Sequence, residues 1–173
     1  LCYRRQRQMC IRDRCLRGTE VLLHPTSEPG SPKMTDRQVA RKARAMENHI
    51  YIVASNTASI DGTPIPAYTC SANSCVVDYK GDTMAEAATG GESMLAHAII
   101  DIDYLRARRR QGGMFNHFSR QLTDVYAMMY SKYPLHTGND LLKDGEVQPH
   151  PDRAWFRKRQ DDLLERLTKA GLL

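Results

Sequence analysis

Thiols and imidazoles are the side chains of this sequence best suited to nucleophilic or metal chemistry, and their spacing predicts structural roles. The 173-residue chain has five cysteines, at positions 2, 10, 15, 70 and 75. An odd number of widely spaced cysteines argues against a disulfide framework, and Cys70 and Cys75 lack the second close pair of a typical structural zinc site. A catalytic pair would need His24 or His97 beside a thiol, which nothing in the spacing indicates. We expect buried core thiols, no metal site and a reducing, cytoplasmic setting.

A short loop is the better candidate for ligand binding. Residues 20–24 form an apolar run that predicts a strand buried on both faces, and the prolines, serines and glycine of residues 25–32 predict a loop. α/β proteins place ligands beyond the carboxyl ends of their strands. Pro25, Thr26 and Ser27 lie at such an end, where we expect a ligand to bind.

The elements around this loop predict a βαβ unit. Thr35 and Gln38 form a capping box that begins a helix over residues 36–48. Its predicted apolar face consists of Val39, Ala43 and Met46, which recur at i, i+4 and i+7. Residues 50–54 are a second continuous apolar strand, and strand, helix and strand in this order indicate an α/β fold. Glu47 falls beside small apolar residues of the helix. Because burying a bare carboxylate is costly, we expect an ion pair or backbone donors to hold it.

The second half of the chain predicts more strands and helices. We expect a hairpin over residues 74–79 and 83–87, a strand over 94–102, and a helix over 104–110 that Asp103 caps. Two more helices follow: one ends at Pro134 and the other starts at Asp152. The apolar face of the first of these two consists of Phe118, Leu122, Val125 and Met129. Three arginines, 108–110, fall in the last turn of a predicted helix, where the helix dipole favours cations. The arginine run therefore has a structural explanation.

Length and charge narrow the classes of function. A chain of 173 residues has room for about one domain, and its apolar runs are far shorter than the roughly 20 residues of a membrane-spanning helix. The net charge of +5 favours an acidic partner such as nucleic acid. However, residues 1–14 hold five of the 25 basic and one of the 20 acidic residues, which leaves 20 basic and 19 acidic residues elsewhere. We expect no nucleic-acid partner and no membrane.

Residues 1–14 differ from the rest of the chain. They show no helical or strand periodicity and contain no Gly or Pro. One interpretation is a basic arm that binds RNA or DNA. Residues 9–14 (Met-Cys-Ile-Arg-Asp-Arg) resemble the translation of a transposase adapter sequence, and we favour a non-native origin, to be set aside before the fold is considered. No apolar stretch follows the charges, so we expect no signal peptide.

Four ordered stretches between residues 15 and 110 resemble motifs of the nitrilase superfamily of carbon-nitrogen hydrolases. Residues 15–26 are similar to its Leu-x-x-Arg-Gly-Ala-Glu-Val-Leu-Leu-x-Pro-Thr stretch, and residues 43–56 to its Ala-Arg-Ala-x-Glu-Asn-x-x-Tyr-x-Val-x-Ala-x-Asn signature. Residues 74–82 are similar to its Gly-x-Ser-x-Ile-Val-x-Pro-x-Gly hairpin, and residues 101–109 to its closing Asp-Leu-Asp strand with a short Arg-ending helix. The order and number of these matches make the resemblance specific to the superfamily, though not to one substrate.

The resemblance implies an α/β fold that is the C-terminal part of the family's four-layer α-β-β-α sandwich. We therefore divide the chain into residues 1–14, a hydrolase part at residues 15–112 and a helical extension at residues 113–173. Family members hydrolyse nitriles, amides or N-carbamoyl groups without a metal or organic cofactor, and they are often oligomeric. The resemblance thus implies a small-molecule amide or nitrile substrate, no cofactor, and a homo-oligomer of the full-length parent.

The resemblance also implies a covalent mechanism. A Cys thiolate attacks the carbon, a Glu acts as general base, a Lys stabilises the oxyanion and water opens the thioester. In the family the Glu and Lys come well upstream, and we recognise none of the three here. Cys2 lies at about the right distance from Gly18 but lacks the aromatic-Pro-Glu context of the family's nucleophile, and Cys15 falls where the family has a core-facing helix residue. We expect no catalytic residue, and a fragment that is inactive and poorly soluble. By the same resemblance, Pro25 to Ser27 match a loop at the family's substrate pocket.

Two functions of other classes stay open. A nucleic-acid-binding module would use residues 1–14 and the basic residues 157–159, and its binding would be sensitive to salt and would disappear when residues 1–14 are deleted. A protein-interaction element would use Trp155, Phe156 and Leu163 of the last helix as an oligomer seam. Packing of that helix on its own parent domain is the simpler outcome for the same side chains.

Overall fold

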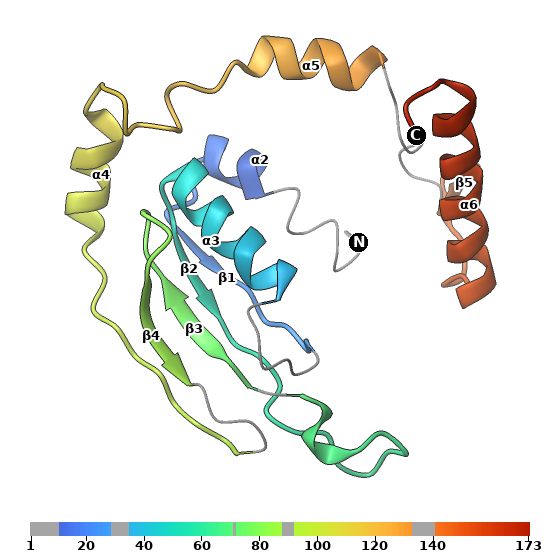
Figure 1. Ribbon diagram of the computed structural model, residues 1–173, viewed down its shortest axis with the longest axis horizontal. Helices are drawn as coiled ribbons and strands as arrows, with labels where there is room; N and C mark the ends of the chain where they lie inside the picture. The colour runs from blue at the N-terminus through green and yellow to red at the C-terminus, as the bar shows by residue number, and fades with distance from the viewer. Residues whose placement is uncertain (1–10, 29–34, 71, 88–91, 133–140) are drawn as a thin grey trace. The chain divides into compact units, whose positions relative to one another are not determined.

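The computed structural model describes residues 11–28, 35–70, 72–87, 92–132 and 141–173 (Figure 1). The chain divides into two compact units, Leu1–Gln121 and Leu122–Leu173, which we treat separately. Within the described residues, no helix is long and apolar enough to span a membrane.

The first unit is built on a four-stranded sheet. Its strands lie in the order β1 (Val21–Leu23), β2 (Tyr51–Ala54), β3 (Ser74–Val77) and β4 (Thr83–Ala87). β1 and β2 are parallel and joined through helix α3 (Asp36–Asn48), whereas β2, β3 and β4 pair antiparallel. These pairings confirm the predicted βαβ unit and the predicted hairpin.

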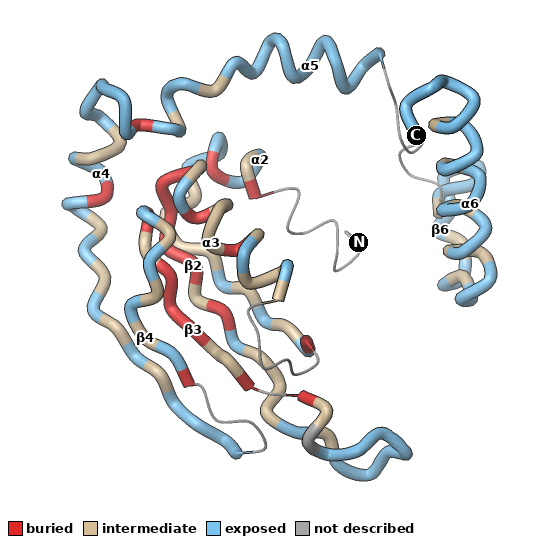
Figure 2. Tube along the Cα trace, in the orientation of Figure 1, coloured by how far each residue is buried: buried red, intermediate tan, exposed pale blue. Residues whose placement is uncertain are grey.

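Two helices, α2 (Ile11–Leu16) and α3, pack on one face of this sheet (Figure 1). The core between these layers consists of Ile11, Cys15, Ala45, Ile50, Ile52, Ala54, Cys75 and Val77. Figure 2 shows the buried residues concentrated along β2, β3 and the inner sides of the helices. The sheet and its helices thus form two layers with a continuous apolar interior.

The opposite face of the sheet is covered at one end only. Tyr51, Tyr79 and Leu105 form a second small core there, to which helix α4 (Ile102–Arg110) contributes Leu105. At the other end Leu23 is 73% exposed. The prediction that β1 is buried on both faces is therefore wrong: β1 is an edge strand of this sheet, and no described residue covers its last side chain.

The cap of α3 confirms the sequence prediction, but its buried face differs. The Thr35 hydroxyl accepts a hydrogen bond from the Gln38 N–H at 3.3 Å, and the Gln38 side chain accepts one from the Thr35 N–H at 2.8 Å. The buried residues of α3 are Arg41, Ala45 and Asn48, whereas the predicted apolar face began with Val39, which is exposed. The buried face of α3 thus includes a charged residue, Arg41, which pairs with the buried Glu28.

Glu47 is held by ion pairs, as expected from its position. One carboxylate oxygen lies 3.2 Å from the Arg12 guanidinium and 2.7 Å from that of Arg44. Glu47 itself is half-buried, so the two arginines replace water on its inner side.

The segment before α4 contains two differences from prediction. Residues 94–102 were expected to form a strand, but residues 92–101 pair with no strand in the described chain, which makes that prediction wrong. The helix begins at Ile102 and is capped by Asp101, whose carboxylate accepts from the Tyr104 N–H at 2.8 Å, so the prediction of Asp103 as the cap is also wrong. The earlier start places Ile102 against the second core.

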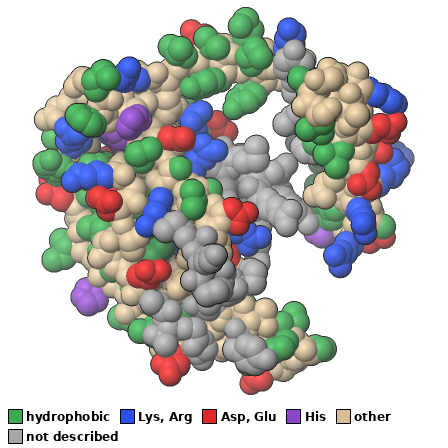
Figure 3. Space-filling model, in the orientation of Figure 1, with side chains coloured by type: hydrophobic (Ala, Val, Ile, Leu, Met, Phe, Trp, Pro, Cys, Tyr) green, Lys and Arg blue, Asp and Glu red, His purple; other side chains and the backbone are tan. Residues whose placement is uncertain are grey.

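The second unit contains two helices and a short hairpin. Its elements are α5 (Thr123–Lys132), β5 (Leu142–Lys143), β6 (Glu146–Val147) and α6 (Arg153–Lys169), and the first unit also holds a 3-10 turn, η1 (Ala67–Thr69). The last helix was predicted to start at Asp152, and Asp152 is its N-cap, accepting from the Trp155 N–H at 2.9 Å. α5 has no buried residue, and its hydrophobic side chains lie on the surface (Figure 3).

Two features of the C-terminal region differ from prediction. The predicted helix through Phe118 begins only at Thr123, because Phe118 instead packs against the first core. The stop predicted at Pro134 lies outside the described residues. The β5–β6 hairpin was not predicted, although Asp144 and Gly145, both with positive φ, form the kind of Asp-Gly turn that typically joins two strands.

Candidate functional site

The carboxyl ends of β1 and β2 lie side by side and bring the predicted substrate loop against the end of β2. Beyond the strands, Thr26 and Asn56 form an isolated parallel bridge. The Thr26 N–H donates to the Ser55 carbonyl at 2.7 Å. The sheet ladder therefore continues into the loop, and Pro25, Thr26 and Ser27 lie at the edge where their place in the sequence predicted them.

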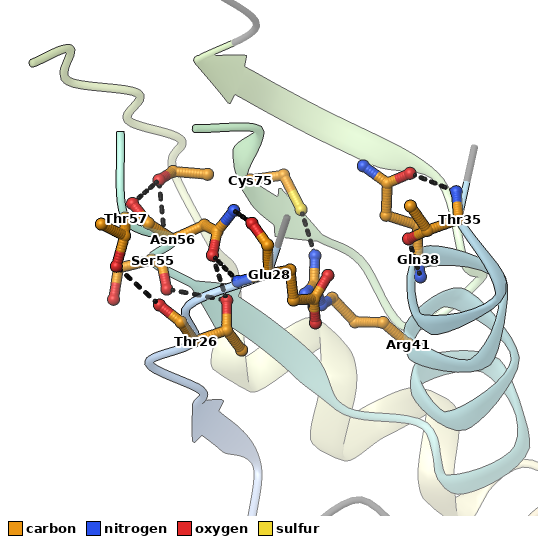
Figure 4. A network of polar contacts seen from close by, with 10 residues as sticks. Thr26, Glu28, Thr35, Gln38, Arg41, Ser55, Asn56, Thr57 and Cys75 are labelled. Carbon is orange, nitrogen blue, oxygen red and sulfur yellow. Dashed lines mark hydrogen bonds and ion pairs between the residues drawn. The ribbon is translucent and has the colours of Figure 1, made fainter. Parts of the chain in front are cut away.

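The Asn56 side chain is the centre of a polar network at this edge (Figure 4). Its Oδ1 accepts from the Thr26 hydroxyl at 3.0 Å and from the Glu28 N–H at 2.7 Å, and its Nδ2 donates to the Glu28 carbonyl at 3.2 Å. Its backbone N–H donates to the Ser74 hydroxyl at 2.9 Å. Asn56 thus links the loop after β1 to the end of β2 and to the start of β3.

A buried ion pair between helix α3 and the same loop holds the loop in place. The Arg41 guanidinium lies 3.3 Å from the Glu28 carboxylate, and their side chains are only 3% and 8% exposed. Arg41 also donates to the Cys75 sulfur at 3.4 Å (Figure 4). Helix α3, strand β3 and the loop therefore meet at one charged contact that is shielded from water.

The three predicted pocket residues differ in what they offer to a ligand. Pro25 and Ser27 are exposed, whereas Thr26 is half-buried and its hydroxyl bonds inward to Asn56 and to the Ser55 carbonyl. The geometry gives Thr26 a role in holding the loop. Contact between these residues and a substrate stays a prediction.

Sequence analysis missed Asn56, Glu28 and Arg41 as members of this site. Asn56 was only one letter of a motif, and Glu28 lay in a segment predicted as loop. One signal for the site was available in the sequence. Arg41, Ala45 and Asn48 are spaced i, i+4 and i+7, so they share one helix face, on which a charge lies beside two small residues. A charge on such a face needs a buried counter-charge.

The described cysteines are core thiols, as predicted. Cys15, Cys70 and Cys75 are free and buried. Burial raises the pKa of Cys15 to about 11, although Arg109 and Arg12 act in the opposite direction. Since the thiolate is the nucleophile, a thiol with such a pKa is poorly suited to attack a substrate. Cys2 and Cys10 lie outside the described residues.

No group of three or more His, Cys, Asp or Glu side chains in the described part of the chain has a geometry that could hold a metal ion. The described polar site at the sheet edge contains one carboxylate, that of Glu28, and it pairs with Arg41.

Comparison with known proteins gives matches over most of the first unit. The family model described as carbon-nitrogen hydrolase matches residues 1–110. A citrullinase from Francisella tularensis subsp. tularensis is 30% identical over 121 residues, which is 66% of this chain and 42% of that protein. The chain thus spans less than half the length of this relative.

Solved structures show the same partial coverage. A carbon-nitrogen hydrolase from Helicobacter pylori G27 aligns with a TM-score of 0.57 and 20% identity, over 73% of this chain and 46% of that one. An amidase from Nesterenkonia sp. AN1 aligns with a TM-score of 0.53 and 17% identity, over 73% and 41% of the two chains. At these identities the likeness shows the fold alone, and it confirms the predicted α/β fold as a part of the nitrilase-type sandwich. Because the family model covers residues 1–110 of 173, the chain belongs to the carbon-nitrogen hydrolase family.

Proposed function

We propose that the protein to which this chain belongs hydrolyses a non-peptide carbon-nitrogen bond in a small molecule. The observation that carries the proposal is the carbon-nitrogen hydrolase match over residues 1–110. The candidate bonds are those of an amide, a nitrile or an N-carbamoyl compound, and no metal or organic cofactor is needed for hydrolysis through a Cys thioester.

The proposed covalent route has support from a structural relative. In a mutant of the Nesterenkonia amidase, the acetamide moiety of fluoroacetamide is covalently added at the active-site cysteine, which supports a cysteine as the nucleophile. In the present chain Cys15, Cys70 and Cys75 are buried in the fold. We therefore place the nucleophile, the general base and the oxyanion-stabilising lysine in parts of the protein other than the described residues, and propose that the 173-residue chain has no activity alone.

Among the three bond types, we favour the N-carbamoyl group. The support is the citrullinase relative, at 30% identity. Citrulline ends in a ureido group, a carbonyl carbon bonded to two nitrogens. Attack of a thiolate on that carbon would release ammonia or the amine and leave an acyl-enzyme that water can open.

In this proposal the chain supplies one wall of the substrate pocket. Pro25 and Ser27, which are exposed at the carboxyl end of β1, are the candidate contacts, and Thr26 holds them in place through Asn56. Ligands of open α/β sheets lie beyond the carboxyl ends of the strands, which supports this placement.

We further propose a cytoplasmic enzyme that forms a homo-oligomer. Three free buried cysteines in the described residues support a reducing compartment. The exposed hydrophobic side chains of α5, among them Val125, Met128 and Met129, are the support for contact with another surface.

Ammonia release tests the proposed function. The assay compares the 173-residue chain with a longer protein encoded by the same reading frame, on citrulline, acetamide and a simple nitrile. We expect the longer protein to release ammonia, citrulline being the best substrate, and the short chain to be poorly soluble and silent. A soluble, active short chain would refute its proposed inactivity. A longer protein that hydrolyses none of the three would refute the function.

A further inference from the structure

One buried histidine lies where helix α3 ends and strand β2 begins. His49 follows α3 in the left-handed conformation, with φ 48° and ψ 61°, and is only 4% exposed. Its carbonyl accepts a hydrogen bond from Nε of Arg109 at 2.9 Å. Helix α4 is thereby attached to this corner of the sheet, and the imidazole ring is enclosed.

The hydrogen bonds of the ring suit the neutral form. Nε2 of His49 lies 3.1 Å from the carbonyl oxygen of Phe115. A carbonyl only accepts, so Nε2 carries the proton. Nδ1 is buried and has no hydrogen-bond partner among the described residues. Uptake of a second proton would create a buried N–H without an acceptor, together with a buried positive charge.

The charged groups around the ring also oppose a positive charge. Helix α4 contributes Arg108 and Arg109, and the segment after α4 contributes His117, whose ring lies edge-on at 6.4 Å. From the sheet side, Tyr79 lies edge-on at 6.4 Å and contacts Tyr51. On α3 itself, Glu47 is already paired with Arg12 and Arg44. Burial lowers the pKa of His49, and His117, Arg108 and Arg109 lower it further, whereas the Phe115 carbonyl raises it.

His49 is one of several contacts that hold residues 111–121 against this corner. The Asn116 side chain donates to the carbonyls of Arg109 and Gln111 at 3.0 and 2.7 Å, which folds the segment onto the end of α4. The Gln121 side chain donates to the Glu47 carbonyl at 2.8 Å. These residues lead from the family-matching part of the chain to the second unit, which begins at Leu122.

We propose that His49 is an acid-sensitive latch that holds residues 111–121 on the α3–β2 corner when its imidazole is neutral and releases them when the imidazole is protonated. Protonation leaves the Nε2–H donor in place, but the charged ring gains hydration only by leaving its buried position. As it leaves, the bond to Phe115 is lost and the segment loses one of its attachments. The latch concerns the segment that precedes the second unit, and it is independent of the proposed hydrolysis.

The direction of the pH dependence follows from the lowered pKa. In the open state the imidazole titrates near its ordinary pKa of about 6.5, and in the closed state it titrates lower. Well above pH 6.5 both states are neutral and the latch is fully stable. As the pH falls below 6.5, the open state binds a proton before the closed state does, so the closed state loses stability until the pH reaches the lowered value.

Hydrogen exchange measured by mass spectrometry tests the latch. The 173-residue chain is studied as a fusion with a soluble carrier protein, and protection of the peptide spanning residues 113–119 is compared at pH 7.5 and 5.5 after correction for the intrinsic rates. We expect protection to fall several-fold at pH 5.5, while the peptide of β2 changes little. His49→Gln keeps a side-chain N–H donor but does not titrate, and its protection should not change with pH. His97→Gln, at an exposed histidine before α4, is the matched control and should respond like the unmodified chain.

Equal loss of protection in His49→Gln and the unmodified chain would overturn the proposal. A second measurement covers the case in which the Gln variant does not fold. Nitrogen chemical shifts of the imidazole in the unmodified chain report its tautomer and charge directly. The proposal expects a neutral ring protonated at Nε2 at neutral pH, and release of residues 113–119 together with protonation. A charged His49 ring beside a protected segment at pH 5.5 would contradict it.

Discussion

At the scale of single residues, the loop at the sheet edge depends on the buried charge of Arg41, which has one counter-charge among the described residues, that of Glu28. Arg41 and Glu28 come from a helix and a loop 13 positions apart in sequence. Removing one partner of a buried ion pair leaves the other charge without compensation, which typically costs about 3–5 kcal/mol. We expect Arg41→Met to lower the free energy of unfolding of the first unit by an amount in this range, and Glu28→Gln to lower it by less, because the Gln amide oxygen still accepts from Arg41.

The double variant Arg41→Met/Glu28→Leu tests whether the cost arises from the unpaired charge. It should be more stable than Arg41→Met alone, because apolar side chains of similar volume can replace a buried pair. Arg106→Met is the matched control in the same unit, since Arg106 pairs with Glu20 at the surface and its loss should change stability much less. Urea unfolding followed by hydrogen exchange of the β2 peptide gives the comparison. Additive losses in the double variant would contradict this account.

The site was only partly predictable from the sequence, for a reason that these residues illustrate. The position of Pro25 to Ser27 beside the end of β2 follows from local signals, because a βαβ unit makes its strands parallel. The bonds of Asn56 to Thr26 and Glu28 join residues 28 to 30 positions apart. No local pattern specifies which side chains meet across such a separation, so only the edge, and not its network, could be predicted.

At the scale of elements, caps and turns were predicted best, since their chemistry lies within a few residues. Thr35 is a direct test. Thr35→Ala removes the hydroxyl that accepts from the Gln38 N–H, and we expect the free energy of unfolding to fall by about 1 kcal/mol. Thr35→Ser keeps the acceptor and should be close to the unmodified chain. Urea unfolding measures both variants. Equal losses in Ala and Ser would show that the methyl group, and not the cap, matters.

Elements that depend on distant partners were predicted less well. Residues 94–102 have the composition of a strand, but a strand is defined by its ladder, and the described chain supplies none for them. β1 likewise has the apolar run of a doubly buried strand and lies at an edge. Helix α2 bears on the origin of residues 1–14. Its Ile11 is 2% exposed and packs in the first core, and the family match begins at residue 1. The proposed non-native origin of residues 1–14 stays a prediction.

At the scale of the whole molecule, two observations support the same proposal: the chain covers only part of its relatives, and it exposes apolar side chains. The chain spans 46% of the Helicobacter hydrolase and 42% of the citrullinase. In the first unit, Leu95 and Ile99 are 87% and 91% exposed on an extended segment that has no described strand partner. An unpaired extended segment with outward apolar side chains is a site for association with other chains. We propose that the rest of the hydrolase domain covers this segment in the complete protein.

The last prediction follows from that segment. Each large aliphatic side chain that becomes fully buried contributes about 1.5–3 kcal/mol, so two exposed ones on one extended edge favour self-association of the isolated chain. Leu95→Lys/Ile99→Lys should raise the soluble fraction and reduce the size of the particles in light scattering, because charge on an open edge opposes pairing. Leu105→Lys, at a fully buried position in the second core, should instead abolish the folded unit. If the double variant aggregates as much as the unmodified chain while Leu105→Lys unfolds, association arises from another surface, and the exposed side chains of α5 become the next to be tested.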